Sequence, residues 1–242
     1  MGRQVNGGVS LTHNMSITRV QYKHQYVATS GTGYAFTSNN TAGNFIVVGV
    51  SGAASTDTAA NFTISDSQGN SYTALTISPQ PAYIGYAIAR IFYAYNIKAG
   101  ANSVAVSIAN SSQDLGFTAV EYSGIKSTAD PLDVEATPIR ETSVSNTTTH
   151  SSSFSPQTGS LIFAIWADEL INPNIMTVTG ANILQTDFAH YDSIAENLSA
   201  NSGSQQLVFN FTASGNSTRV ICLACFLPAP VTVNKGTFFQ FM

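Results

Sequence analysis

The sequence is poor in charge. Only 9 % of its 242 residues are Asp, Glu, Lys or Arg, whereas an average soluble domain has about 25 %. The net charge is −4 and the pI is near 5.4. Because nucleic acid is bound by a positively charged face, this composition argues against a nucleic-acid partner.

Signal-like and membrane-spanning segments are missing too. Residues 1–15 hold no apolar run of the kind found in signal peptides. The longest apolar candidate, residues 83–95, is interrupted by Arg90 and is shorter than a membrane span. Asn6 stands where a myristoylation site needs Ser or Thr. We therefore expect a chain made and folded in a cytoplasm, without membrane insertion.

Cysteine is scarce as well. The two cysteines, Cys222 and Cys225, form a CxxC spacing inside an apolar run of β type. A redox CxxC opens a helix, whereas residues three apart on a strand point to opposite faces. The spacing predicts buried, reduced thiols with no disulfide and no metal.

Neutral polar residues take the place of charge: the chain has 29 Ser, 26 Thr and 19 Asn beside 43 % hydrophobic residues. No sustained helical period occurs, and short Val, Ile, Tyr, Phe and Thr-rich segments alternate with Gly, Asn, Ser or Pro. This pattern predicts an all-β fold. The strands expected in the first half cover residues 17–27, 34–37, 44–50, 62–65, 71–77, 83–96, 103–109 and 116–122.

The second half resembles the first. Residues 41–48 (TAGNFIVV) match 157–164 (QTGSLIFA), and in the same order 95–106 match 196–208 and 117–122 match 220–226. This order indicates a duplication. We predict two tandem antiparallel β-sandwich repeats, jelly-roll or immunoglobulin-like, which could pack as one unit. The expected divisions are an N-terminal arm at 1–15, repeats at 16–128 and 129–230, and a C-terminal tail at 231–242; residues 143–153 form a loop or edge strand.

Three expected strands are apolar without alternation: residues 45–50, 161–167 and 220–227. A strand with one wet face would alternate, so these need cover on both faces. The sister repeat or a partner subunit could supply it. Together with the low charge, this favours a homo-oligomer.

Nucleophilic and metal sites find little support. Residues 49–53 (GVSGA) lack the last glycine of a nucleophile elbow and precede no helix. Residues 187–192 (DFAHYD) are the densest titratable cluster, and a surface loop explains them better than the start of a metal site. The histidines are scattered and form no Ser/His/Asp set: they are His13, His24, His150 and His190.

Four acidic positions attract attention. Asp168 and Glu169 are adjacent, so their side chains would diverge on a strand. This favours a polar end of the buried strand over acid–base chemistry. Glu121 interrupts an apolar strand, and we expect it to reach solvent or to pair with a cation such as Arg90. Asp66 with Asn70 misses the calcium-loop spacing and reads as a hairpin turn.

Aromatic side chains cluster around one long expected strand and could stack on sugar rings, although core packing explains most of them. They are Tyr83, Tyr86, Phe92, Tyr93 and Tyr95. We predict no catalytic residue, no cofactor and no metal ligand anywhere in the chain.

Four segments together resemble a known family: residues 41–48, 66–72, 91–106 and 119–133. They are similar to duplicated β-sandwich modules of tailed-phage virion proteins and of bacterial surface or secreted proteins. The resemblance covers residues 41–133 well and the rest faintly. Its motifs are turn and strand signatures and carry no catalytic residues. A chain without a visible signal fits the phage members better.

The resemblance implies a non-enzymatic virion structural protein, either a capsid decoration (cement) subunit or a fibre component, assembled in the host cytoplasm. Its partners would be copies of itself and other capsid or tail proteins. The alternative is a lectin-like adhesion module that binds a host-surface glycan through the tyrosines of residues 83–95. A hydrolase built on Asp168, Glu169 and Glu121 is a third hypothesis. Because exposed Phe238, Phe239 and Phe241 would be unfavourable, we expect the tail to dock on the sandwich or on a neighbour.

Overall fold

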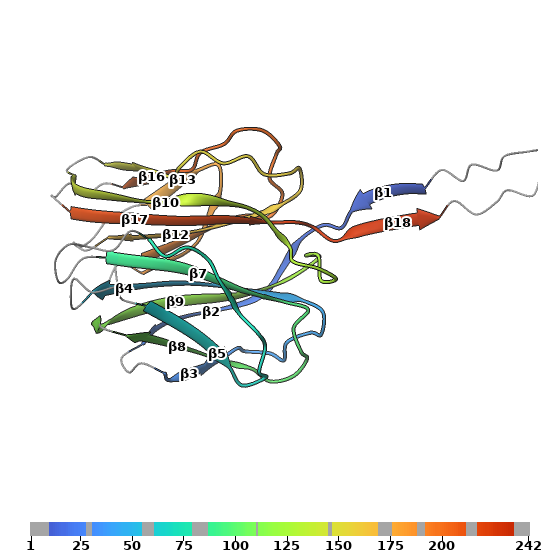
Figure 1. Cartoon of the computed structure of the whole chain (residues 1–242), viewed down its shortest axis with the longest axis horizontal. Coiled ribbons are helices and arrows are strands. Elements are labelled where there is room, and N and C mark those ends of the chain that lie inside the picture. Colours follow the sequence, from blue (N-terminus) through green and yellow to red (C-terminus); the bar gives the residue numbers. More distant parts are fainter. Residues whose placement is uncertain are drawn as a thin grey trace, which may run out of the picture.

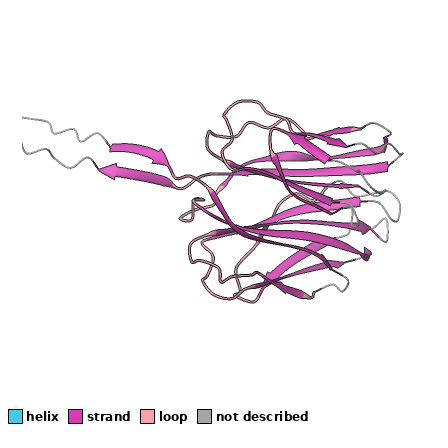
Figure 2. Ribbon diagram, turned by 180° about the vertical axis from the view of Figure 1, so that it is seen from behind, coloured by secondary structure: helices cyan, strands magenta, loops and turns pink. Residues whose placement is uncertain are grey.

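The computed structural model describes residues 10–27, 31–54, 61–78, 87–109, 111–144, 147–168, 176–187, 192–211 and 217–234. Within these ranges every regular element is a β-strand, and all strand pairs are antiparallel (Figure 2). The all-β prediction is confirmed.

The first sandwich is built from two sheets. Its larger sheet has the order β2 (Thr18–Val27), β9 (Ser111–Ser123), β4 (Phe45–Ala54), β7 (Ala87–Tyr95) and β6 (Thr73–Ala74). Its smaller sheet has the order β3 (Gly33–Ala35), β8 (Ser103–Ala109) and β5 (Asn61–Asp66).

The second sandwich repeats this plan. Its larger sheet has the order β10 (Leu132–Val144), β17 (Ser217–Phe226), β12 (Leu161–Asp168), β15 (Asp192–Asn197) and β14 (Asn182–Asp187). Its smaller sheet has the order β11 (Thr148–His150), β16 (Val208–Phe211) and β13 (Met176–Thr179). When the strands of each sandwich are numbered in chain order, the larger sheet runs 1-8-3-6-5 and the smaller sheet 2-7-4 in both sandwiches. This is the jelly-roll order with the fifth strand moved to the larger sheet.

The turn before the third strand of each sandwich shows how the two repeats correspond. Gly43 donates its N–H to the carbonyl of Ile97, and Gly159 donates to the carbonyl of Ala200. Residues 41–48 therefore match 157–164, as the sequence predicts. Ile97 matches Ala200 and not Leu198, so the expected pairing of residues 95–106 with 196–208 is wrong by two positions at this turn.

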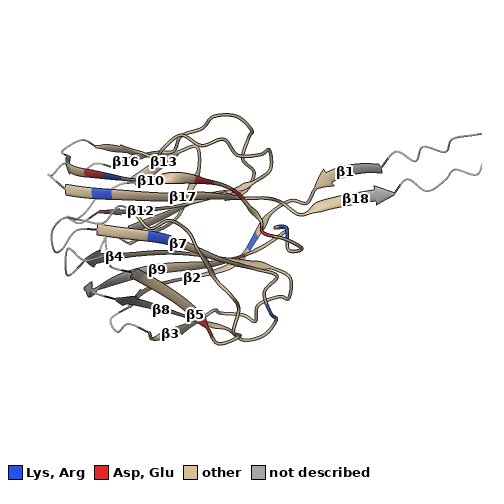
Figure 3. Ribbon diagram, viewed as in Figure 1, with Lys and Arg blue, Asp and Glu red and all other residues tan. Residues whose placement is uncertain are grey.

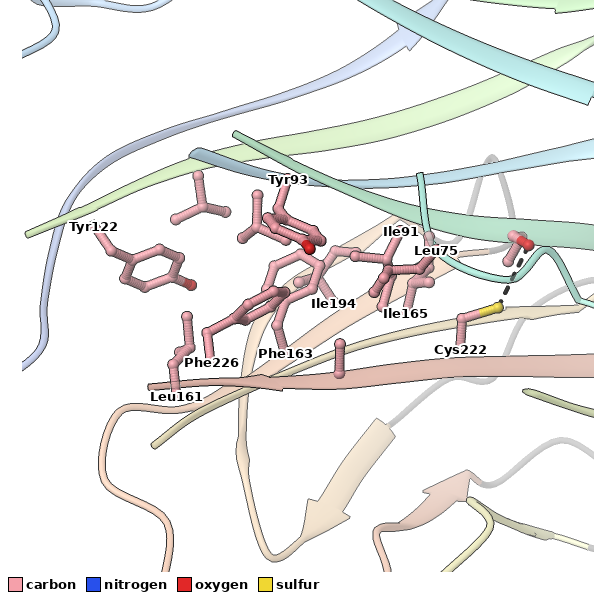
Figure 4. Close-up of a cluster of buried hydrophobic side chains, with 14 of the residues drawn as sticks. Leu75, Ile91, Tyr93, Tyr122, Leu161, Phe163, Ile165, Ile194, Cys222 and Phe226 are labelled. Carbon is pink, nitrogen blue, oxygen red and sulfur yellow. Dashed lines mark hydrogen bonds between the residues drawn. The ribbon is translucent and has the colours of Figure 1, made fainter. Parts of the chain in front are cut away.

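The two sandwiches pack back to back through their larger sheets, which gives four layers (Figure 1). β4 sends Ile46, Val48 and Val50 into the first sandwich and Phe45 and Val47 towards the second. β12 and β17 divide their side chains in the same way. The sister repeat thus supplies the second cover that the apolar strands require. Figure 4 shows this shared core, with Tyr93 and Tyr122 facing Phe163 and Phe226.

Individual strands depart from the expected bounds. The predicted strand at 71–77 is reduced to β6. Beyond β6, Leu75 and Ser78 each make one isolated hydrogen bond to the main chain of β7 in place of a continuous ladder. β9 starts at Ser111, earlier than expected. Within residues 143–153 lies β11, an edge strand, as one of the two expectations had it. Residues 83–86 of the expected strand at 83–96 lie outside the described residues.

Candidate functional site

The two ends of the described chain form a ribbon of their own. β1 (Ser10–Asn14) pairs with β18 (Pro230–Asn234), and the ribbon projects from the sandwiches (Figure 1). The described parts of the expected arm and of the expected tail thus pair with each other, which the sequence did not predict. Antiparallel pairing between segments more than 200 residues apart leaves no local period in the sequence. The tail phenylalanines, residues 238–241, lie outside the described residues.

The ribbon joins the body at a narrow neck. Met15 donates its N–H to Ala229 over 2.8 Å, and Ala229 donates to the carbonyl of Gly124 over 2.7 Å. Gly124 has φ +80°, and a Cβ added there would lie 2.3 Å from the carbonyl oxygen of Ser16. Only glycine fits this crossing, so the direction in which the ribbon leaves is fixed by backbone packing.

A hollow of about 280 Å³ lies beside the neck. None of the described residues that line it has an ionisable side chain. The residues around it are Asn14, Met15, Ser16, Ile17, Thr158, Gly159, Leu198 and Ser199. Met15 remains 47 % exposed there, so the neck presents an apolar side chain to solvent.

Among the carboxylates whose burial the structure describes, Glu121 is the most deeply buried, with 0 % exposure. It accepts hydrogen bonds from Asn40 Nδ2 (2.7 Å), Thr41 N (2.9 Å), Asn44 Nδ2 (2.7 Å) and Gln21 Nε2 (2.7 Å). The expectation of a solvent-exposed or cation-paired carboxylate is wrong, because neutral amides satisfy its oxygens. Its role is to hold the turn at residues 40–44 against β9.

Arg90, the cation expected beside Glu121, points elsewhere. Its Nε donates to the carbonyl of Leu75, and its guanidinium lies 5.3 Å from the ring centre of Phe92. Burial lowers the pKa of Arg90, an effect opposed by the charges of Cys222 and Glu135.

The second sandwich holds the matching turn with a different strand. Asp133 of β10 accepts from Gln157 N (2.6 Å), Gln157 Nε2 (2.9 Å) and Ser160 Oγ (2.8 Å). The position on β17 that corresponds to Glu121 is Cys225, since Ile46 pairs with Glu121 and Ile162 with Cys225. The turn-holding carboxylate thus comes from β9, next to β4, in the first repeat and from β10, the edge strand beyond β17, in the second, which indicates a structural role.

Asp66 closes a turn, but the expectation of a hairpin is wrong, because β5 before the turn pairs with β8 and β6 after it pairs with β7 in the other sheet. Its carboxylate accepts from Asn70 N (2.9 Å), Asn70 Nδ2 (2.7 Å), Tyr72 Oη (2.9 Å) and Asn102 Nδ2 (2.9 Å). Burial raises its pKa, but these hydrogen bonds outweigh burial and bring the pKa below its usual 3.8. Its four donors fill the oxygens that a calcium ion would need.

A pH-dependent stability follows from Asp66. Because its pKa is lowered in the folded state, its contribution is present above pH 3.8 and is lost as the pH falls through the folded value. We expect the difference in melting temperature between the wild type and Asp66→Asn to shrink as the pH falls from about 5 to about 2. A difference that stays constant across this range would contradict the assignment.

A polar bridge links the two sandwiches. Glu196 of β15 accepts from Arg19 Nη1 of β2 and from Tyr122 Oη of β9. Burial, followed by the charge of Glu196, raises the pKa of Tyr122 well above its usual value. At the related position across the interface Tyr93 donates to Asp130 over 2.9 Å. These contacts fix how the sandwiches are aligned.

Asp168 ends β12 and is buried rather than a solvated end of the strand. Its Oδ2 lies 3.0 Å from Arg219 Nε and accepts from Ser217 Oγ over 3.0 Å. Arg219 is itself 2 % exposed and stacks 4.2 Å over Phe211. The expectation of a polar strand end missed this ion pair, because its two residues are 51 positions apart in the sequence. Glu169 lies outside the described residues.

The two cysteines lie on opposite faces of β17, as predicted. Cys222 faces the core between the sandwiches, and Cys225 faces the interior of the second one (Figure 4 shows Cys222). Burial, with the charge of Glu135, raises the pKa of Cys222 to about 12. Burial also raises the pKa of Cys225.

Both thiols should therefore resist alkylation in the folded protein. We expect iodoacetamide at about pH 8 to leave them unmodified and to label both after unfolding, because the thiolate is the reactive form. Mass spectrometry of the native protein gives the readout. Rapid labelling without denaturant would contradict the burial of these side chains.

The other predicted candidates form no site. Ser51 lies buried within β4, which continues as a strand to Ala54, so residues 49–53 are not an elbow. His24 Nδ1 bonds Thr118 Oγ1 (2.9 Å), whereas His13 and His150 lie in β1 and β11. Asp187 pairs with Asp192 across β14 and β15; His190 lies outside the described residues.

The aromatic cluster of the glycan hypothesis is mostly core. Phe92 and Tyr93 are 3 % and 1 % exposed, and only Tyr95 of the described members is exposed, at 37 %. Tyr83 and Tyr86 lie outside the described residues. A ring that is packed on both faces has no free face on which a sugar could stack.

Charged side chains are sparse and scattered over the strands (Figure 3). Among the described residues, no group of three or more His, Cys, Asp or Glu side chains could hold a metal ion. The described part of the chain also contains no helix long and apolar enough to cross a membrane.

No protein-family model matches this chain, and neither does any curated protein. Among solved structures, a crystal structure of a protein from Eubacterium rectale that is proposed to be secreted aligns with 85 % of this chain and 74 % of its own. The TM-score is 0.26 and the identity 12 %. A likeness this weak supports no conclusion about fold or function.

Proposed function

We propose that this chain is a non-enzymatic structural protein of a tailed-phage particle, carried on the particle surface as a decoration subunit or fibre component. The observation that carries this proposal is the β1–β18 ribbon, in which both ends of the described chain leave the sandwiches together. The resemblance of residues 41–133 to modules of tailed-phage virion proteins and of bacterial surface or secreted proteins also supports it.

The body suits a rigid spacer. Two jelly rolls share a continuous apolar core, and buried contacts from Glu196 to Arg19 and Tyr122 fix their alignment. Each acidic residue considered for catalysis and described here serves the fold: Glu121 holds a turn and Asp168 pairs with Arg219. In this proposal the ribbon attaches the protein to the particle, and the two sandwiches are the part that it holds on the particle surface.

The ribbon can be removed without cutting the body. Deleting residues 231–242 takes away Val231–Asn234 of β18 but no member of the three cores. We expect the truncated protein to keep its melting temperature and β circular dichroism, and to lose most of its binding to particles in a co-sedimentation assay. Outright unfolding would place the ribbon in the core, and normal attachment would remove its anchoring role.

A further inference from the structure

The free edge of β1 can be mapped from one hydrogen bond. Met15 N–H donates to the carbonyl of Ala229 at 2.8 Å, one step beyond the ladder that pairs Asn14 with Pro230. Bonded pairs alternate with pairs whose main-chain groups point outward in an antiparallel ladder. The N–H and C=O groups of Ser10, Thr12 and Asn14 therefore point to the outer edge of β1.

The outer edge of β18 differs in one respect. By the same alternation it presents Pro230, Thr232 and Asn234, and Pro230 has no N–H to donate. The edge of β1 has its full set of donors. In the described part of the chain neither outer edge pairs with another strand.

Only β18 of the two strands carries a usual protection of an exposed edge. Natural proteins block such edges with charged side chains, proline or bulges. β1 reads SLTHN, with no Lys, Arg, Asp, Glu or Pro, whereas β18 reads PVTVN and has Pro230. A two-stranded ribbon of this size is marginally stable alone. β1 is thus an open edge on an element that gains stability from a further strand.

We propose that β1 pairs with β1 of a second copy of this chain. The pairing is antiparallel, with a two-fold axis at Thr12, so that Thr12 lies opposite its own copy and Ser10 lies opposite Asn14. In this register every outward N–H and C=O of β1 meets an outward group of the partner, and two ribbons form one four-stranded sheet. The same patch serves both copies, as closed dimer symmetry requires.

The position of the ribbon permits this contact. It extends clear of both sandwiches (Figures 1 and 2), and antiparallel pairing places the two bodies at opposite ends of the joint sheet. The inference rests on the proposed function in that it names the partner of the attachment element. It is tested on purified protein without particles, so a dimer that binds no particle would refute the proposed function alone.

Two matched proline substitutions test the edge. Thr12→Pro removes an outward N–H of β1, and Thr232→Pro removes the one opposite it on β18. Thr12 and Thr232 face each other in the ladder, so neither change removes a hydrogen bond within the ribbon. For the wild type and Thr232→Pro we expect a light-scattering mass of twice 25.5 kDa, and for Thr12→Pro the mass of one chain.

A monomeric wild type, or a Thr12→Pro protein that remains dimeric, would overturn the proposal, as would loss of the dimer in Thr232→Pro alone. Thermal unfolding of both variants shows whether the body stays intact. A second pair of variants, with cysteine in place of proline, tests the pairing without the risk that a proline disrupts the ribbon. Thr12→Cys should form a disulfide-linked dimer under mild oxidation, because directly opposed residues of a bonded pair lie about 5.5 Å apart at Cα.

Leu11→Cys is its control, since Leu11 would face His13 of the other copy. Cys222 and Cys225 are buried and do not compete. Equal cross-linking at positions 11 and 12 would contradict the register, and no cross-linking at position 12 would contradict the pairing.

Discussion

Replacing Gly49 by valine is expected to lower the free energy of unfolding by about 3 kcal/mol, the upper end of the usual cost of overpacking a core. Gly49 lies in the middle of β4, on the face that packs against the larger sheet of the second sandwich. A Cβ there would meet Ile194 Cδ1 at 2.8 Å, Phe163 Cε1 at 3.2 Å and Ile165 Cβ at 3.4 Å. Valine adds two further methyl groups to this contact, so the sheets must separate.

Urea unfolding gives the measurement, with the single tryptophan, Trp166, as a buried fluorescent probe. Gly33→Val is the matched control: Gly33 lies on exposed β3, and its added Cβ would contact only Ser103 Cβ at an ordinary 3.5 Å. We expect Gly33→Val to change stability by less than about 0.5 kcal/mol. Alkylation adds a local readout, because Cys222 between the sandwiches should become more reactive than Cys225. Equal stability of both valine variants would contradict the close packing of the sheets.

Removal of the Glu121 carboxylate is expected to have an even larger effect on stability. Glu121→Ala leaves four hydrogen-bond donors without their acceptor at a buried site. Unsatisfied buried groups cost about 1–3 kcal/mol each, and Gln21 can turn to solvent, so we expect a total loss of about 4 kcal/mol. The chemical-denaturation midpoint measures it.

Two controls separate the hydrogen bonds from the volume of the side chain. Glu121→Gln keeps the shape, and a flip of Asn40 would let its Oδ1, which has no hydrogen-bond partner among the described residues, accept from the new amide. We expect that variant to lose about half as much stability. Asp133→Ala removes the equivalent, less buried clamp of the second sandwich and should cost about 1–2 kcal/mol. A Glu121→Ala protein as stable as the wild type would show that the clamp is dispensable.

The features that could be predicted from sequence are those written in short stretches of chain. Turn glycines and apolar strands at 41–48 and 157–164 predicted matching halves, and the missing alternation in 45–50 predicted a second cover. The turn closed by Asp66 and Asn70 was local and was predicted as a turn, but not as a link between two sheets, because pairing with β8 and β7 is not written in it. The opposite faces of Cys222 and Cys225 follow from strand geometry alone.

What failed depends on strand order, which a local pattern does not contain. Glu121 stood out as an interruption, but three of its donors come from the loop before β4, about 80 residues away. Asp168 meets Arg219 only because β12 and β17 are neighbours. The ribbon unites the first and last described strands. Jelly-roll order could not be told from an immunoglobulin-like one for the same reason.

The proposed function meets its most direct test in the composition of particles. Tailed-phage particles produced by the organism that encodes this chain would be purified on a density gradient and analysed by quantitative mass spectrometry, with antibody labelling of intact particles. The account predicts that the chain bands with the particles in a fixed multiple of copies and is reached by antibody from outside. Absence of the chain from the particles, with all of it in the soluble fraction, would contradict a virion role.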